Sequence, residues 1–269
     1  MPPNWQGKIA LVTGASSGIG AATARALARQ GLRVVLVARR LARLQGVCDE
    51  IQAAGGQAQA LAADLSAPDE RQGLYEQLHA SSREPDVLVN NAGLGWYGYY
   101  NDMPWETAQE MLSVNVAAVA HLTRLFLPGM RQRRRGHIIN VGSISGSLPN
   151  QGIAIYSASK SFLDSFTTAL YRELVGSQVY VSVVRAGPVI SEFYQNARLR
   201  PGGRPIPAER FAVPAERVAA AVQRLLRRPR RVVYVPGLLI FSPWLETLFG
   251  WLVDRLGPLL LRRPQSPGE

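Results

Sequence analysis

The sequence predicts an α/β fold in which a doubly wound parallel sheet of about seven strands is covered by helices on both faces. Short apolar segments alternate with amphipathic segments of helical length as far as about residue 235. The segment Arg33–Ala38 is apolar after its first residue, as is typical of a strand buried on both faces of a parallel sheet. A glycine-rich turn, Thr13–Gly20, follows the first apolar segment and leads into a helical one. This alternation implies right-handed crossovers and a ligand site beyond the carboxyl ends of the strands.

Each strand is predicted where a short, mostly apolar run is bounded by turn residues, and each helix where apolar residues recur every three to four positions. In chain order the predicted strands are Lys8–Val12, Arg33–Ala38, Gln57–Ala63, Asp86–Asn90, His137–Val141, Val179–Val184 and Val232–Val235. The predicted helices are Ile19–Gln30, Leu41–Ala54, Pro68–Ser81, Trp105–Arg131, Ile155–Leu174 and Pro214–Arg227.

One segment, Ile190–Ala212, interrupts the alternation. It holds three prolines, two adjacent glycines and four arginines without clean periodicity. A long stretch without secondary structure in a compact domain is usually functional or disordered, and this one follows the sixth strand at the ligand edge. We therefore expect residues 190–212 to form a substrate lid within one catalytic domain, residues 1–237. Residues 238–269 should form an apolar helical extension.

The composition is that of a globular protein, because 47% of the 269 residues are apolar and only 18% are charged. Cys48 is the only cysteine, which excludes an internal disulfide and fits a reducing compartment. His79, His121 and His137 lie far apart in the chain, so we predict no metal site. The first six residues lack the charged start and apolar stretch of a secretion signal, and we expect a cytoplasmic protein.

The net charge of +11 is compatible with nucleic acid, a membrane surface or anionic small molecules as partners. The chain has no nucleic-acid-binding motif and no series of aromatic residues for base stacking, so we expect no nucleic acid. An arginine-rich soluble enzyme is the simpler interpretation.

Tyr156 and Lys160 are separated by one helical turn, so their side chains would project from the same face of a helix. Lys160 is conspicuous, because 28 of the 30 basic residues are arginine and Lys8 is the only other lysine. An ammonium group about 4 Å away could lower the pKa of a phenol by up to ~3 units, into the range of acid–base catalysis. For this pair alone, a core tyrosine beside a solvated lysine is the competing interpretation.

The glycine-rich turn is suited to a pyrophosphate, since its backbone can approach closely and the helix that follows offers free amide groups. The second predicted strand ends in Ala38, which cannot bind a ribose 2′-hydroxyl as an acidic residue would. Arg39 and Arg40 follow and could bind a 2′-phosphate. They therefore favour NADP(H) over NAD(H), although two solvated arginines at the start of a helix are the alternative.

Five motifs occur in order along the chain: Thr13–Gly20, Asn90–Gly93, Asn115, Ser143 and Tyr156–Lys160. Together they resemble those of the short-chain dehydrogenase/reductases of ordinary length. The match runs from about Lys8 to Val189, some two-thirds of the chain. The resemblance implies a Rossmann-type fold and hydride transfer between a nicotinamide and the carbon of a carbonyl or alcohol group.

The resemblance also implies a role for each catalytic position. Tyr156 would exchange a proton with the substrate oxygen, while Lys160 would lower the pKa of the phenol and hold the nicotinamide ribose. Ser143 would orient the carbonyl or hydroxyl group, and Asn115 would hold a water that links Lys160 to solvent. For Ser143 and Asn115 taken singly, a turn serine and a helix-interior amide are the alternatives.

For the cofactor, the resemblance implies that Asp64 and Leu65 border the adenine and that Asn91, Ala92 and Gly93 support the sheet and contact the adenine ribose. The other implied cofactor contacts are Gly14, Ser16, Ser17, Gly18, Ile19, Gly20, Arg39, Arg40, Tyr156, Lys160, Gly187, Val189 and Ser191. One departure is that Ala186-Gly187 stands where the family usually has Pro-Gly, so the glycine is present but local rigidity is in doubt. Ser191 stands where a threonine is common.

The sequence says less about the substrate. Trp96 and Tyr97 follow the Asn-Ala-Gly turn and indicate an apolar or ring-bearing substrate, although loop aromatics also serve as packing. The four arginines of residues 190–212 could meet an anionic group or simply be solvated. We expect a carbonyl reductase or alcohol dehydrogenase that acts on a hydrophobic ketone, aldehyde or acyl-linked ketone, as a homodimer or homotetramer. The alternative is a non-catalytic NADP-sensing or membrane-associated interaction protein.

The segment Leu238–Leu261 is rich in Leu, Trp and Phe but also contains charges and prolines, so it is a poor transmembrane helix. Its apolar residues recur at helical spacing: Trp244, Leu245, Leu248, Phe249, Leu252, Leu256 and Leu259. Arginine pairs flank it, including Arg262-Arg263. This pattern fits peripheral contact of residues 238–263 with an anionic membrane, and the alternative is a cover for the pocket or a subunit contact.

Overall fold

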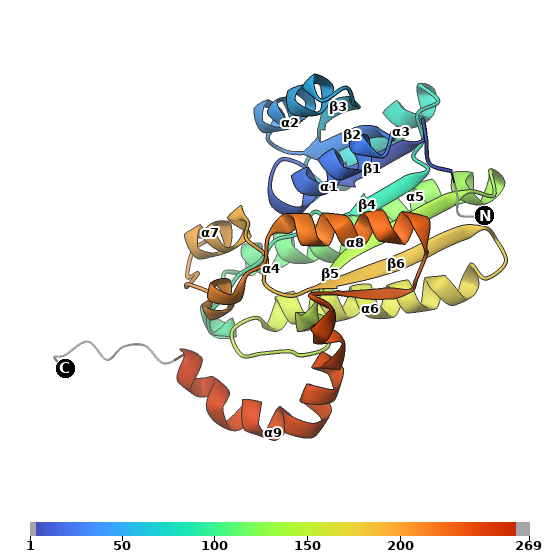
Figure 1. Cartoon of the computed structure of the whole chain (residues 1–269). Coiled ribbons are helices and arrows are strands. Elements are labelled where there is room, and N and C mark those ends of the chain that lie inside the picture. Colours follow the sequence, from blue (N-terminus) through green and yellow to red (C-terminus); the bar gives the residue numbers. More distant parts are fainter. Residues whose placement is uncertain (1–3, 262–269) are drawn as a thin grey trace.

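The computed structural model describes residues 4–261 and confirms the predicted fold class (Figure 1). Seven strands form one sheet in the order β3-β2-β1-β4-β5-β6-β7, and every neighbouring pair is parallel. The strands are β1 (Ile9–Thr13), β2 (Arg33–Ala38), β3 (Gln57–Ala62), β4 (Val87–Asn90), β5 (Gly136–Ser143), β6 (Val179–Ala186) and β7 (Val232–Val235). All seven agree with the predicted strands to within two residues, and β5 extends far enough for Ser143 to be its last residue.

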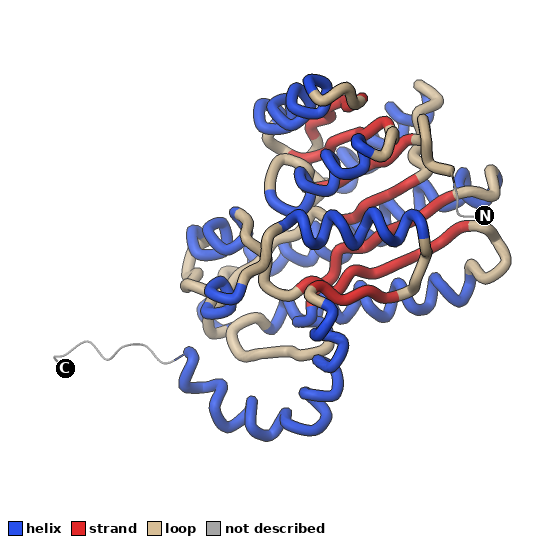
Figure 2. The backbone as a smooth tube through the Cα atoms, viewed as in Figure 1, coloured by secondary structure: helices blue, strands red, loops and turns tan. Residues whose placement is uncertain are grey.

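Helices cover both faces of the sheet (Figure 2). The α-helices of the described residues are α1 (Gly18–Arg29), α2 (Leu41–Ala53), α3 (Pro68–Ala80), α4 (Trp105–Leu112), α5 (Ala118–Gln132), α6 (Ala154–Glu173), α7 (Glu192–Leu199), α8 (Ala215–Arg227) and α9 (Ser242–Leu261). Helices α1, α2 and α8 lie on one face of the sheet and α3, α5 and α6 on the other.

The sheet separates two apolar cores because successive side chains of a strand point to opposite faces. Ala10 and Val12 of β1 pack with α1, α2 and α8, whereas Ile9 and Leu11 pack with α3, α5 and the end of α6. Chain crossovers run to opposite sides of β1 and β4, so these neighbouring strands flank the point where the strand order reverses. In doubly wound sheets, ligands bind in the crevice outside this point.

The predicted helix Trp105–Arg131 is interrupted. A π-helical segment, Ser113–Ala117, separates α4 from α5, and it contains the buried Asn115. A π segment places one extra residue in a turn, which displaces the side chains that follow and is frequent at functional sites. The continuous span Trp105–Gln132 is also the one helix among those described that is long and apolar enough to cross a membrane. Nearly half of its most apolar window is buried within the protein, as in a core helix.

The expectation that residues 190–212 lack secondary structure was wrong. This segment contains α7 and a 3₁₀ turn, Pro207–Phe211, and α7 buries Tyr194 and Ala197. The prolines and glycines that obscured the periodicity lie after α7, which ends at Leu199.

The extension after β7 is helical, as predicted, but it is mostly exposed. Exposed apolar side chains of α9 are Trp244, Leu245, Leu248, Phe249, Trp251, Leu252 and Leu256. In Figure 1, α9 lies at the edge of the molecule below α6. Of the predicted features of this extension, the side chain of Leu259 and the pair Arg262-Arg263 lie outside what the structure describes.

Candidate active site

The glycine-rich turn between β1 and α1 is held so tightly that side chains would not fit at two of its glycines. A Cβ added to Gly14, whose φ is +63°, would lie 2.9 Å from Ala92 Cα, and one added to Gly20 would lie 2.2 Å from the Gly14 carbonyl oxygen. Asn91 Nδ2 donates to the carbonyl oxygen of Thr13 at 2.9 Å. Thr13 Oγ1 in turn accepts from the backbone N–H groups of Asn91 and Ala92, both at 3.0 Å. The predicted supporting role of Asn91 and Ala92 therefore has a physical basis.

A cavity of about 960 Å³ extends from this turn to the helix that carries Tyr156. All residues predicted to contact the cofactor line this cavity except Gly20. Gly20 lies behind the turn, where the absence of a side chain lets the turn pack closely. The predicted substrate residues Ser143, Trp96 and Tyr97 line it too, whereas Asn115 does not. A cradle of backbone at one end and titratable side chains at the other fits a nicotinamide dinucleotide.

At the catalytic end, Ser143 comes from the end of β5, and Tyr156 and Lys160 come from one face of α6. Ser143 and Tyr156 both line this end of the cavity. Lys160 Nζ donates to the carbonyl oxygen of Val141 at 3.0 Å and lies 5.6 Å from the centre of the Tyr156 ring. The geometry predicted from the spacing of Tyr156 and Lys160 is thus confirmed.

The predicted acidification of the phenol by Lys160 is wrong for these residues alone. Burial raises the pKa of Tyr156 to about 12, and Ser143 offsets only part of that rise. Burial also lowers the pKa of Lys160 to about 8, against the opposing effect of Asp164. Loss of water disfavours both charged forms, so the site holds a protonated phenol at neutral pH.

Asn115 joins three elements near this centre. Its Nδ2 donates to the Leu94 carbonyl oxygen at 2.9 Å and to Ser159 Oγ at 3.1 Å, and its Oδ1 accepts from Leu94 N–H at 2.8 Å. The π segment is thereby tied to the loop after β4 and to α6. The predicted role of Asn115 in holding a water stays a prediction.

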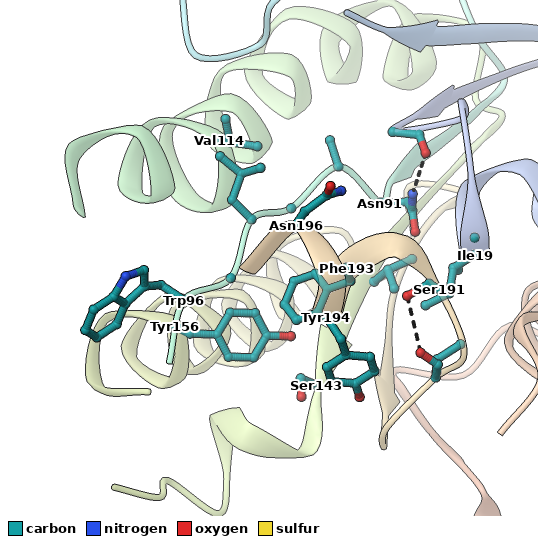
Figure 3. Close-up of a pocket in the computed structure, with 18 of the residues that line it drawn as sticks. Ile19, Asn91, Trp96, Val114, Ser143, Tyr156, Ser191, Phe193, Tyr194 and Asn196 are labelled. Carbon is teal, nitrogen blue, oxygen red and sulfur yellow. Dashed lines mark hydrogen bonds between the residues drawn. The ribbon is translucent and has the colours of Figure 1, made fainter. Parts of the chain in front are cut away.

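The helix α7 brings two aromatic side chains that the sequence analysis did not assign to the site. Phe193 lies with its ring centre 5.4 Å from that of Tyr156, and its ring fills the space where Gly95 has no side chain. Tyr194 is buried and lines the same cavity (Figure 3). The two adjacent aromatics, which follow Ser191 after one intervening residue, were the available signal. They could not be assigned because no helix was expected there.

Trp96 links the loop after β4 to residues 190–212. It is buried, and its Nε1 donates to the carbonyl oxygen of Pro201 at 3.0 Å. Tyr97 is buried beside it. Both expected substrate residues therefore lie in the apolar part of the cavity, and Trp96 also has a packing role.

At the other end of the cavity, Arg39 and Arg40 each meet a carboxylate that the sequence analysis did not consider. Arg39 Nη1 lies 2.9 Å from Glu110 Oε1, and Arg40 Nη2 lies 2.9 Å from Glu192 Oε2. Arg40 Nη2 also donates to Ser16 Oγ at 3.1 Å. Arg43, which was not predicted, pairs with Glu192 as well. These partners come from α4 and α7, so sequence spacing offered no signal for them.

Comparison with protein families gives a match to the short chain dehydrogenase family over residues 8–201. An uncharacterized oxidoreductase of Myxococcus xanthus is 40% identical over 69% of this chain and 73% of its own length. A ketoacyl reductase of a Nostoc species is 39% identical, over 68% of this chain and 64% of its own. A very-long-chain 3-oxoacyl-CoA reductase of Anas platyrhynchos is 37% identical, over 66% and 58% respectively. The chain thus spans less than two-thirds of the length of the latter two relatives.

Two solved structures are similar throughout the sheet. A metagenomic short-chain oxidoreductase in complex with NADP is 37% identical, with a TM-score of 0.75 over 86% of this chain and 98% of its own. A short chain dehydrogenase/reductase from Burkholderia phymatum in complex with NAD is 27% identical, with a TM-score of 0.82 over 99% of both chains. The cofactor in the first complex carries a 2′-phosphate, and the cofactor in the second does not.

Proposed function

The chain belongs to the short-chain dehydrogenase/reductase family and is an oxidoreductase of carbonyl or alcohol groups, and from this premise we propose that it uses NADP(H) to reduce a hydrophobic ketone. The observation that carries the proposal is the placement of Ser143, Tyr156 and Lys160 in the cavity that begins at the glycine-rich turn. The nicotinamide dinucleotide supplies the hydride when bound. The residues of the chain supply the binding surface, the orientation of the substrate and the proton.

Tyr156 acts as the acid in this proposal. Carbonyl reduction places negative charge on the substrate oxygen, and a proton donor within hydrogen-bond reach neutralises it. A phenol whose pKa lies near 12 is fully protonated at neutral pH, which is the form that reduction requires. Ser143, which lines the cavity together with Tyr156, orients the substrate oxygen toward the phenol. The protonated phenol is therefore in the form that can act as the acid in reduction.

Lys160 has a positioning and electrostatic role. Its ammonium is anchored by the Val141 carbonyl group and borders the space beside Gly93, where a Cβ would lie 3.5 Å from Lys160 Nζ. A cation in this place stabilises the phenolate that remains after Tyr156 has given up its proton. Lys160 also has donors left to hold a ribose hydroxyl.

The preference for the phosphorylated cofactor rests on the arginines after β2. Ala38 offers no carboxylate to a ribose 2′-hydroxyl, while Arg39 and Arg40 line the cavity next to Ser16 and Ser17. Guanidinium groups bind phosphate through paired, charge-assisted hydrogen bonds. The NADP bound by the metagenomic relative agrees with this preference, and the NAD bound by the Burkholderia relative makes it a point to test.

We propose an acyl-linked ketone as the substrate class. Trp96, Tyr97, Phe193 and Tyr194 make the region around Tyr156 apolar, which suits a hydrocarbon chain on either side of a keto group. Two of the relatives are named as reductases of ketoacyl substrates. Both the chemistry of the cavity and these names support the class without fixing the chain length.

The test is NADPH oxidation with 3-oxoacyl thioesters of increasing length, with hydrophobic ketones and aldehydes, and with short polar ketones as the control. The proposal expects turnover that rises with chain length and is faster with NADPH than with NADH. Turnover only with polar ketones would overturn the substrate class. Retained NADPH binding with no turnover on any carbonyl would favour a nucleotide-sensing protein instead.

We propose that the protein works in the cytoplasm as a homodimer or homotetramer that associates through α4–α5 and α6. Exposed aromatic side chains, Trp105 on α4 and Tyr171 on α6, support these surfaces. Light scattering of the wild type and of Tyr171→Glu tests the assembly. The same mass for both proteins would place the contact elsewhere.

For α9 we propose contact with an anionic membrane. At 3.6 residues per turn its seven exposed apolar side chains fall within an arc of about 160°, and Glu246 and Asp254 lie outside that arc. Arg255 lies within the arc and could reach lipid headgroups. The net charge of +11 adds a general attraction to anionic lipid.

A further inference from the structure

A buried carboxylate, that of Asp164, lies one helical turn beyond Lys160 on α6. Asp164 is 8% exposed and Lys160 is 5% exposed. Residues four positions apart on a helix lie on the same face, with Cβ atoms about 5–6 Å apart. Tyr156, Lys160 and Asp164 therefore follow one another along one face of α6, with the lysine between the phenol and the carboxylate.

Two neighbouring strands hold this carboxylate in place. Arg185 of β6 donates from Nε to Asp164 Oδ1 at 2.9 Å, and its Nη1 donates to the hydroxyl of Tyr234 on β7. The guanidinium carbon also lies 5.3 Å from the centre of the Tyr234 ring. The side chains of Asp164 and Arg185 are only 10% and 16% exposed, so salt screens their charges much less than it does at the surface.

The second oxygen of Asp164 faces the turn that follows Ser143. This atom, Oδ2, is buried and has no hydrogen-bond partner among the described residues. A Cβ added to Gly146 of that turn would lie 2.8 Å from Oδ2 and 2.8 Å from the backbone carbonyl carbon of Lys160. The turn thus packs closely against this part of α6. A buried carboxylate oxygen without a hydrogen bond is costly, and a cation nearby offsets that cost.

Asp164 is the carboxylate among the groups packed around Lys160 in the described part of the chain. Element by element, those groups are Tyr156 and Asp164 of α6, Val141 and Ser143 of β5, Arg185 of β6, Tyr194 of α7, Gly93 after β4 and Asn115 of the π segment. Tyr156 and Tyr194 are uncharged at neutral pH, because burial raises the pKa of both phenols. The charge of Arg185 is balanced by Asp164 itself.

Asp164 acts on Lys160 through the protein interior, since Lys160 Nζ donates to the Val141 carbonyl group. Burial lowers the pKa of Lys160 to about 8, and the attraction of Asp164 acts in the opposite direction. Burial also raises the pKa of the Asp164 carboxyl, and Arg185 and Lys160 oppose that rise. Without the carboxylate, Lys160 would lose its proton at a lower pH.

We propose that Asp164 is a positioning residue for the reaction: held by Arg185, its buried carboxylate keeps Lys160 in the ammonium form beside Tyr156 and so sets the upper pH limit of ketone reduction. This inference rests on the proposed function, in which the Lys160 cation stabilises the Tyr156 phenolate. Asp164 does not line the cavity, so it acts on the proton step through Lys160 alone.

The test measures the pKa of Lys160 in Asp164→Asn and Arg185→Met, two variants that should move it in opposite directions. Asp164→Asn removes the attraction and keeps the shape of the side chain. Two unit charges ~6 Å apart at an effective dielectric of ~20 correspond to at most ~2 pKa units, so Lys160 should titrate roughly one to two units lower than in the wild type. Arg185→Met leaves the carboxylate to Lys160 alone, so Lys160 should titrate about half a unit to one unit higher.

The titration is followed by NMR of the free enzyme with labelled lysine. In the Lys8→Arg background Lys160 is the only lysine, so its signal can be read whether or not the protein turns over a carbonyl. The alkaline limb of kcat/KM with NADPH and a hydrophobic ketone should shift with the NMR titration. The two measurements separate the charge effect from its consequence for the reaction.

Asp86→Asn is the matched control. The side chain of Asp86 is 8% exposed and pairs with Arg135 at 2.9 Å, at the opposite edge of the sheet. Its loss should destabilise the protein as the loss of Asp164 does, because each leaves a partly buried arginine without its partner. The pKa of Lys160 should nevertheless stay near 8 in this variant.

The double variant Asp164→Asn/Arg185→Met leaves neither charge of the pair unpartnered, and so it guards against a single variant that fails to fold. Lys160 should titrate at a lower pH in the double variant than in Arg185→Met, which measures the effect of Asp164 a second time.

A Lys160 pKa that Asp164→Asn leaves unchanged would overturn the inference, because the carboxyl would then be protonated or too distant. Shifts in the same direction in Asp164→Asn and Arg185→Met would also overturn it, since both variants would then act through packing. Opposite NMR shifts without movement of the kcat/KM limb would overturn the role in the reaction. Absence of turnover in the wild type would overturn the proposed function, while the NMR titration would still confirm or refute the charge effect.

Discussion

The cavity has two walls built on different principles. The wall made by the glycine-rich turn and β4 is fixed by backbone sterics and by partly buried hydrogen bonds between Thr13 and Asn91. The wall made by α7 is held by partly exposed ion pairs and by contacts between aromatic rings. The first kind of wall cannot move without breaking, while the second can be displaced by a better partner. A cofactor site that must keep its shape is thus placed opposite a substrate site that must open.

The two walls come together at Tyr156, which donates the proton. Tyr156→Phe should therefore have the largest effect on activity. Loss of the proton donor should lower kcat by about 10²- to 10⁴-fold, the usual contribution of general acid catalysis. NADPH affinity should stay nearly unchanged, because the ring and its contact with Phe193 are retained. Tyr171→Phe, on the exposed side of the same helix, is the control and should keep full activity. Normal turnover of Tyr156→Phe would remove the tyrosine from the proton step.

The Arg39→Ala/Arg40→Ala variant tests whether these arginines, which also pair with carboxylates of α4 and α7, recognise the 2′-phosphate. Charge-assisted hydrogen bonds contribute about 1.5–3 kcal/mol each, so the loss of one from each arginine should weaken NADPH binding roughly 10²- to 10⁴-fold. NADH binding should hardly change, because that cofactor has no phosphate at this position. Fluorescence titration with both cofactors measures the two affinities. An equal loss for both would show that the arginines do not recognise the 2′-phosphate.

The packing of the fixed wall can be tested by replacing glycine with alanine at two positions. The substitution should lower the free energy of unfolding at Gly20 and raise it at Gly73. Gly20→Ala in α1 would place a Cβ 2.2 Å from the Gly14 carbonyl oxygen, so the turn would have to shift. We expect a loss of about 1–3 kcal/mol in the free energy of unfolding and weaker binding of any dinucleotide. Gly73→Ala in α3 meets nothing within 4 Å, and should stabilise the protein by roughly 0.5–1 kcal/mol. Denaturant unfolding of both variants decides, and a gain for Gly20→Ala would mean that this wall is not tightly packed.

The motifs of the fixed wall could be predicted where their spacing is local. The glycines of the turn lie within a few positions of one another, and Tyr156 and Lys160 lie one helical turn apart, so both patterns can be read from the chain. Asn91 meets Thr13 across 78 positions, and its role could be predicted only from the family resemblance. The movable wall depends on contacts between distant segments. Glu192 meets Arg40 across 152 positions and Glu110 meets Arg39 across 71, so no spacing rule could pair them.

The expected acidity of Tyr156 failed for a related reason. Proximity of Lys160 could be predicted from the helix, but the pKa also depends on burial, which is a property of the whole packed site. Lys160 is buried and Tyr156 is partly buried, and the cost of desolvation outweighs the expected charge effect on the pKa of the phenol. Phe193, whose ring packs against Tyr156, and Tyr194 line the same site, and the sequence analysis had left both outside it.

The pH dependence of the reaction should report this burial. In the free enzyme Lys160 loses its proton as the pH rises through about 8, whereas an unburied lysine does so near 10.5. We therefore expect kcat/KM to fall above pH 8, by about tenfold per pH unit, because the cation that stabilises the Tyr156 phenolate is lost. The chain has only two lysines, so lysine-selective labelling gives two side-chain NMR signals, and Lys8→Arg removes one of them. A remaining signal that titrates near 10.5 would contradict the assigned burial of Lys160.

Removal of α9 should have the smallest effect on folding. Like α7, this helix is not held by a tightly packed core, and its apolar face is exposed. Leu239 packs close to Gly187, and Ser242 is buried, with its Oγ 3.4 Å from Ser147 Oγ, so a truncation should keep both and remove residues 243–269. Because the exposed apolar face of α9 gives little to the core, the free energy of unfolding should change by no more than about 0.5 kcal/mol. Pelleting with vesicles of anionic lipid should be lost, while neutral vesicles should retain neither protein. If the folded truncation still pellets with anionic vesicles, the membrane contact lies elsewhere. If the truncation instead changes the mass measured by light scattering, the apolar face of α9 is a subunit contact.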